Sequence, residues 1–406
     1  MKHRSFNACF RRTSLIALSV LSLCLFWRCD KPDPCALEQH RGKVITTTEL
    51  GTYTADQIRS LFDAFHINFT LQPVGDVRVL ALNYWTEDPF GDRQAVSAAL
   101  YLPETTADEF PLISIQHGTI FQRDQAPSIN HLYSLEGVMG VLMASNGYIA
   151  LAPDGLGLGI NESFHPYIHE TGSAIPIVDG IRAVRQYSCM EDLSLSPDIF
   201  LVGYSEGGYV TMTAHKVIES DYRDEISVTA SAPMAGPYDI RYIADTILQQ
   251  DTYDNPGYFG YVFMTYNTIY GWNRLEEVFL PAVAADLPEL YDGNHSGGEI
   301  NALLPHTIRD LFTADFLTGF LGSGESEVKS AMEDNSVNAW PAEAPILLVH
   351  GQNDITVPYG VSLKTIEDMT ATGAASIRLI TVNGDHTGAA LTATDSALIW
   401  IDSFRP

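Results

Sequence analysis

From residue 112 onward, short apolar segments alternate with segments of helical periodicity, and this alternation restricts the chain to few folds. The apolar segments are residues 112–116, 148–152, 199–202, 226–230, 346–349 and 377–382. The helical segments are residues 136–145, 175–187, 207–219, 361–369 and 389–404. Nearly continuous apolar runs are typical of strands buried on both faces, and strands that alternate with helices form parallel sheets. The chain therefore predicts an α/β fold with a mostly parallel central sheet flanked by helices.

Two regions depart from this alternation. A helical segment at residues 54–65 and two β-rich runs, residues 77–85 and 95–102, come before it. Between residues 240 and 342 the order fails, and aromatic side chains gather there: Tyr253, Tyr258, Phe259, Tyr261, Phe263, Tyr266, Tyr270 and Trp272. We interpret this stretch as a largely helical insertion, a cap over one end of the sheet. The predicted core is then residues 52–239 and 343–406, and the cap is residues 240–342.

The N-terminus has the pattern of an export signal. Residues 1–12 are basic, and residues 14–27 are apolar and uncharged. The apolar run is shorter than the roughly 20 residues that span a bilayer, so it is typical of a signal peptide, here residues 1–28. A retained signal anchor is the alternative. Cys29 and the polar segment after it resemble a bacterial lipoprotein signal, in which the cysteine is acylated and becomes the mature N-terminus. Residues 29–51 would then be a tether.

The net charge and the cysteine and histidine spacings limit which partners and cofactors the protein can bind. With 50 acidic and 23 basic residues, the formal net charge is -27, which disfavours binding to nucleic acids and to anionic membrane surfaces. Membrane attachment is therefore expected only through a lipid on Cys29. An oxidising compartment would permit a disulfide between Cys35 and Cys189. No cysteine or histidine spacing matches a metal site, so neither a metal nor another cofactor is expected, and the oligomeric state stays open.

The strongest local motif surrounds Ser205. An apolar segment ends at Gly203, a helical segment begins near Gly207, and these two glycines flank Ser205 at positions -2 and +2. This spacing allows a sharp, strained turn from strand to helix that presents the serine hydroxyl at the helix N-terminus. A side chain at either glycine would clash across the turn. Ser205 is therefore the candidate nucleophile, and a structural glycine-rich turn is the alternative.

A nucleophilic serine needs a base and a carboxylate that orients the base. In this architecture the chain order is serine, acid, histidine. The apolar segment at residues 346–349 leads to Asp354, and the one at residues 377–382 leads to His386. Asp385 competes for the acid role, but it adjoins His386 in sequence and so is expected to point elsewhere. His350 is assigned a structural role, and the remaining candidates are isolated or loop histidines: His117, His165, His169, His295 and His306.

The nucleophile also needs an oxyanion hole made of two backbone N–H groups. One is expected from Glu206, which follows the nucleophile. The other is expected from the loop after residues 112–116, where Gly118 permits a close approach of the backbone and Thr119 supplies the N–H.

These residues resemble the α/β-hydrolase superfamily, from about residue 77 to the C-terminus. Within it, residues 152–159 (APDGLGLG), 165–167 (HPY) and 179–185 (DGIRAVR) are similar to those of secretory lipase-like esterases. The resemblance implies hydrolysis of small-molecule esters through an acyl-enzyme and without a cofactor. The acidic residue next to the candidate nucleophile, Glu206, departs from the pattern of this family. Two alternatives remain: a serine peptidase of the prolyl-oligopeptidase type, and a non-catalytic surface binding protein on a hydrolase scaffold.

Overall fold

The computed structural model describes residues 35, 37 and 39–405. A nine-stranded sheet forms the centre of a compact unit that begins at Leu37. Its strands are β1 Val44–Tyr53, β2 Val77–Glu87, β3 Arg93–Pro103, β4 Phe110–Gln116, β5 Ile149–Pro153, β6 Leu195–Tyr204, β7 Ala230–Met234, β8 Ile346–Gly351 and β9 Ile377–Val382. The spatial order is β1-β2-β3-β5-β4-β6-β7-β8-β9. Pairing is antiparallel from β1 to β5 and parallel from β5 to β9, which confirms the predicted mostly parallel sheet.

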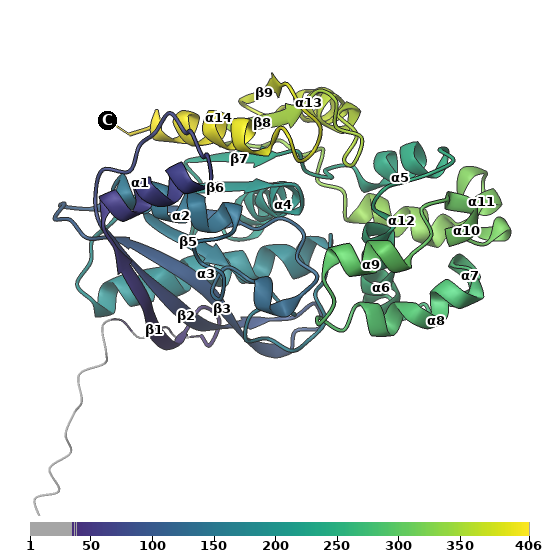
Figure 1. Cartoon of the computed structure of the whole chain (residues 1–406), viewed down its shortest axis with the longest axis horizontal. Coiled ribbons are helices and arrows are strands. Elements are labelled where there is room, and N and C mark those ends of the chain that lie inside the picture. The colour runs from purple at the N-terminus through teal and green to yellow at the C-terminus, as the bar shows by residue number, and fades with distance from the viewer. Residues whose placement is uncertain (1–34, 36, 38, 406) are drawn as a thin grey trace, which may run out of the picture. The chain divides into compact units, whose positions relative to one another are not determined.

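Helices cover both faces of this sheet (Figure 1). One face carries α1 Ala55–Ala64, α2 Leu135–Ser145 and α14 Ala390–Asp402, and the other carries α3 Glu170–Met190, α4 Glu206–Asp221 and α13 Gly360–Thr372. Neighbouring strand residues serve opposite faces. Leu112 packs into the core beneath α3 and α4, whereas Ile113 packs into the core beneath α2 and α14. Burial on both faces accounts for the continuous apolar runs of these strands.

Eight short helices gather beyond one end of the strands, on the right in Figure 1, and we call them the cap. They are α5 Ile240–Leu248, α6 Pro256–Ile269, α7 Leu275–Val278, α8 Pro281–Leu290, α9 Gly297–Leu303, α10 Ile308–Leu311, α11 Ala314–Leu321 and α12 Ser326–Asp334. Their own core is aromatic. The ring of Phe263 lies edge-on to Phe279 and Phe316, with centroids 5.4 and 5.5 Å apart. A short 3-10 helix, η1 Arg123–Gln125, lies outside the cap.

The N-terminal part of the sheet differs from the sequence prediction. The predicted tether was wrong for residues 44–51, because they belong to β1, which pairs antiparallel with β2. β1 is rich in threonine and mostly exposed, so it shows no apolar run, although threonine favours strands. Its place at the sheet edge lets it remain polar. The predicted signal peptide and Cys29 lie outside the described residues.

The strand predicted at residues 226–230 begins four residues too early, since β7 is Ala230–Met234. Ile226 and Val228 are buried, but they precede the ladder that joins β7 to β6. β7 itself is made of small residues, proline and methionine, which have weak strand propensity. The predicted helix at residues 54–65 is confirmed as α1, and Thr54 caps it in a capping box with Gln57.

Candidate active site

The turn that carries Ser205 is strained and tightly packed. β6 ends at Tyr204 and α4 begins at Glu206, and Ser205 between them has φ 61° and ψ -123°, which a residue with a side chain rarely adopts. A Cβ on Gly203 would lie 2.3 Å from the carbonyl oxygen of Gly207, and one on Gly207 would lie 2.1 Å from that of Gln116. Both contacts are impossible, so the turn requires glycine at both positions.

The structure brings Ser205, His386 and Asp354 together. His386 follows β9, and its Nε2 lies 2.8 Å from Ser205 Oγ. Asp354 follows β8, and its Oδ2 lies 2.6 Å from Nδ1 of His386. A neutral imidazole satisfies both contacts, since Nδ1–H donates to the carboxylate and Nε2 accepts from the hydroxyl. The hydroxyl is therefore hydrogen-bonded to a base that a carboxylate orients.

Asp354 is held from several sides. Its Oδ1 accepts the backbone N–H groups of Thr356 and Val357, each at 3.0 Å, and its Oδ2 also accepts Nε2–H of His350 at 3.0 Å. Burial opposes ionisation of Asp354, but the hydrogen bonds from His350 and His386 outweigh it and lower the pKa to about 2. Asp354 is thus a carboxylate at neutral pH.

His350, to which the sequence assigns only a structural role, is hydrogen-bonded to Asp354. It is fully buried, and its Nδ1 accepts from Ser362 Oγ at 2.7 Å while Nε2–H donates to Asp354. The competing carboxylate, Asp385, instead accepts the backbone N–H of Gly388 at 2.7 Å. The spacing of four residues between His350 and Asp354 was the available signal for their contact.

The two N–H groups expected in the oxyanion hole come from the nucleophile turn and from the loop after β4. The N–H of Glu206 is at the first residue of α4, and the N–H of Thr119 follows β4. Neither has an acceptor among the described residues. Glu136, which the sequence did not single out, accepts the neighbouring N–H of Gly118 at 3.0 Å and so anchors this loop to α2. Both amides are therefore available to a bound oxyanion.

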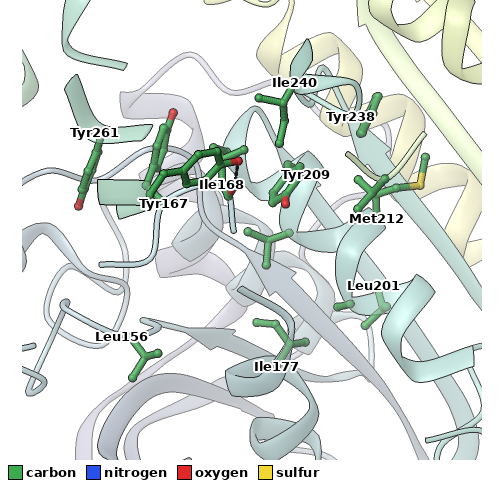
Figure 2. Close-up of a cluster of buried hydrophobic side chains, with 14 of the residues drawn as sticks. Leu156, Tyr167, Ile168, Ile177, Leu201, Tyr209, Met212, Tyr238, Ile240 and Tyr261 are labelled. Atoms are coloured by element: carbon green, nitrogen blue, oxygen red, sulfur yellow. Dashed lines mark hydrogen bonds between the residues drawn. The ribbon is translucent and has the colours of Figure 1, made fainter. Parts of the chain in front are cut away.

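An apolar pocket opens beside Ser205 between the sheet and the cap. Its lining is predominantly apolar, as is typical of small-molecule sites. Its cap lining comes from α5, the segment before α6, α6 and α12: Ile240, Ile243, Ala244, Ile247, Tyr253, Tyr258, Phe259, Val262 and Met332. Tyr167 and Ile168, which Figure 2 shows side by side, line it from the core. Tyr261 does not line the pocket, because its ring stacks 4.6 Å from that of Tyr167.

A second serine–histidine–carboxylate hydrogen-bond series lies elsewhere in the structure, but a substrate has no access to its serine. Ser231 Oγ lies 2.8 Å from Nδ1 of His215, and Nε2 of His215 lies 2.9 Å from Glu219. Ser231 of β7 and His215 of α4 are fully buried, where no substrate reaches them. Glu219 also accepts the backbone N–H groups of Glu343 and Ala344, so this chain ties α4 to the segment before β8.

The comparisons with known proteins agree with this geometry. A family model described as secretory lipase matches residues 130–404, well over half of the 406 residues. The chain belongs to the secretory lipase family. Members of this family are lipase- or esterase-like hydrolases of the α/β-hydrolase fold that act on small-molecule esters, and the family suggests export. The search of curated proteins found no match to this chain.

Solved structures share the fold of this chain. The rice cell wall degrading esterase LipA from Xanthomonas oryzae is 25% identical with a TM-score of 0.80, over 90% of this chain and 98% of LipA. A protein from Legionella pneumophila is 24% identical with a TM-score of 0.81, over 89% and 98% of the two chains. Candida antarctica lipase A is 19% identical with a TM-score of 0.65, over 90% and 83%. The last two support the fold alone.

Among the described residues, no cluster of three or more histidine, cysteine, aspartate or glutamate side chains is suited to a metal ion. Within the same residues, no helix is both long and apolar enough to cross a bilayer. Cys35 and Cys189 are each disulfide-bonded.

Proposed function

We propose that this secretory lipase is an exported serine hydrolase that cleaves carboxylic esters through an acyl-enzyme intermediate. The observation that carries the proposal is the continuous hydrogen-bond chain from Ser205 through His386 to Asp354, beside an apolar pocket. Each member has the chemistry that nucleophilic catalysis requires: an oriented hydroxyl, a neutral base and an ionised carboxylate.

In the acylation half-reaction, Ser205 Oγ attacks the ester carbonyl carbon while Nε2 of His386 accepts its proton. The N–H groups of Thr119 and Glu206 donate to the oxygen that becomes negative. Collapse of the tetrahedral intermediate breaks the bond to the alkoxide, which takes the proton back from Nε2–H. In deacylation, Nε2 of His386 takes a proton from water while the water oxygen attacks the acyl carbon. Collapse of the second tetrahedral intermediate breaks the bond to Ser205 Oγ, which takes the proton back from Nε2–H, and the acid is released. Asp354 stabilises the imidazolium in both halves.

The experiment that tests this proposal is labelling with a fluorophosphonate probe, together with turnover of p-nitrophenyl esters. Ser205→Ala is expected to abolish labelling and to reduce kcat by several orders of magnitude, about 10⁶ in another serine hydrolase. Ser231→Ala is the matched control, because Ser231 is the buried serine that is hydrogen-bonded to His215. This variant is expected to retain labelling. Full labelling of the Ser205→Ala variant would refute the assignment. Turnover of amides without turnover of esters would favour a peptidase.

A further inference from the structure

A buried histidine–carboxylate pair lies directly beside the candidate nucleophile. Nε2 of His165 is 2.7 Å from Oε1 of Glu206, and their side chains are 9% and 0% exposed. The ester mechanism uses neither side chain, although the sequence shows both: the acid after Ser205, and the histidine of the His-Pro-Tyr segment. The fold brings them together across 41 residues of sequence.

The hydrogen-bond partners fix where the protons of this pair are. Nδ1 of His165 lies 2.8 Å from the carbonyl oxygen of Leu156, which can only accept, so Nδ1 carries a hydrogen. The 2.7 Å contact between Nε2 and Glu206 requires a second hydrogen between them. With that proton the pair has no net charge. Without it, a buried glutamate stands beside a neutral imidazole, and the net charge is -1.

Within the described residues, no other side chain forms a hydrogen bond or an ion pair with Glu206. Oε2 of Glu206 is buried and has no hydrogen-bond partner within this part of the chain. The rings that face His165 belong to His117, Tyr167 and Tyr261, with centroids 6.1, 6.2 and 5.5 Å away. Both ring nitrogens of His117 point to backbone carbonyl groups, those of Gly118 and Asp154, and not to Glu206. His165 is therefore the group that neutralises Glu206.

The negative charge of Glu206 acts on groups that line the substrate pocket. Glu206 lines that pocket together with Ser205, and its own backbone N–H is one of the two expected oxyanion donors. Burial, and next to it the charge of Glu206, raises the pKa of Tyr258 on the opposite wall to about 12. A negative charge that acts on a neighbouring phenol also opposes the negative charge that forms on the ester oxygen, and low polarity strengthens the repulsion.

We propose that His165 and Glu206 are a positioning pair that keeps the oxyanion hole free of net negative charge, and that loss of their shared proton suppresses ester turnover at alkaline pH. This inference rests on the proposed ester hydrolysis. Burial alone would lower the pKa of His165, but attraction to Glu206 and the hydrogen bond between them outweigh it and raise the pKa above its ordinary value. The proton is thus present at neutral pH and is lost as the pH rises through the raised value.

The test compares kcat/KM as a function of pH for four proteins: the wild type, Glu206→Gln, His165→Gln and the double variant. In Glu206→Gln the amide can donate to a neutral imidazole, so no proton is left to lose, and the alkaline decline of the wild type is expected to disappear. In His165→Gln the amide still donates to Glu206, but the negative charge stays. Its kcat/KM is expected to fall about ten- to a hundredfold at neutral pH, and the double variant is expected to recover most of that loss.

A surface pair supplies the control. His295 lies 3.3 Å from Asp292, and both are partly exposed on the cap, so His295→Gln is expected to leave the pH profile unchanged. An alkaline decline that persists in Glu206→Gln would overturn the inference, as would a double variant no more active than His165→Gln. The first of these outcomes stands even if His165→Gln does not fold. A wild type without fluorophosphonate labelling or ester turnover would instead refute the proposed function itself.

Discussion

At the scale of single residues, Asp354 has more partners than the mechanism requires. It accepts from His386, from His350 and from two backbone N–H groups, so its carboxylate is fixed in place and charged. A buried carboxylate with this many donors stays ionised well below neutral pH. We therefore expect Asp354 to act on His386 through orientation and charge, without accepting its proton.

Asp354→Asn is expected to keep the fold and to reduce kcat for p-nitrophenyl esters by a large factor, about 10⁴ in a triad of another fold. The amide cannot hold the imidazole in the tautomer whose Nε2 accepts from Ser205. Asp385→Asn is the matched control, because the Asp385 side chain contacts the backbone of Gly388. If Asp385→Asn were the damaging change and Asp354→Asn the mild one, the orienting acid would be Asp385.

The sequence predicts the residues whose place follows from chain order. Ser205, Asp354 and His386 each follow a strand of a parallel sheet, so the fold alone gathers them at one edge. Glu136 and His165 cannot be found in this way. These contacts depend on how α2 packs against the loop after β4, which holds Gly118, and on how the loop after β5 packs against Glu206, and no local pattern encodes either.

At the scale of elements, the apolar residues of the cap fall into two groups. Ile247 of α5 and Phe259 of α6 line the pocket beside Ser205. Phe263, one turn further along α6, is buried among cap phenylalanines instead. The aromatic cluster of the sequence is therefore divided between the pocket and the cap's own core, and only the members on the pocket side can contact a substrate.

Alanine at Phe259 or Ile247 is expected to change which acyl chain length is preferred, because a methylene gained or lost in an apolar pocket is worth about ten- to two-hundredfold in specificity. The measurement is kcat/KM on p-nitrophenyl esters of increasing chain length. Trp272→Ala is the control, since Trp272 stacks on Tyr270 outside the pocket and is expected to retain the profile. An unchanged profile in the Phe259 and Ile247 variants would make the cap a scaffold without a role in specificity.

The elements that the sequence predicts well are those buried on both sides. β4 and β8 follow apolar runs to within a few residues, because a short continuous apolar run between turn residues is typical of a strand inside a parallel sheet. β9 also matches its predicted run, although it is an edge strand whose residues are mostly exposed or half-buried. β1 and β7 lack that signal. β1 is a polar edge strand, and β7 is built from small residues that let Gly208 approach Met234 closely.

At the scale of the whole molecule, charge and anchoring have to be considered together. The formal net charge of -27 opposes adsorption to anionic lipid, so an attachment to membranes has to come from hydrophobic insertion. A single acyl chain gives only marginal binding, whereas two or more anchor a protein stably. The segment with the sequence for such an anchor, Cys29 after the apolar run at residues 14–27, lies outside the described residues.

We propose that the mature enzyme begins at Cys29 and is held at the membrane by acyl chains on this residue. Mass spectrometry of the native protein is expected to find an acylated Cys29 at the N-terminus. Cys29→Ser is expected to block acylation, so that the protein no longer sediments with the membrane fraction. The folded domain is expected to retain its kcat toward p-nitrophenyl esters, because the site is built from residues between Thr119 and His386. Cys24→Ser is the matched control, since it alters a cysteine inside the apolar run and is expected to leave anchoring intact. Cleavage elsewhere with a free thiol at Cys29 would show an ordinary secreted enzyme, and loss of anchoring in Cys24→Ser with retention in Cys29→Ser would move the lipid to Cys24.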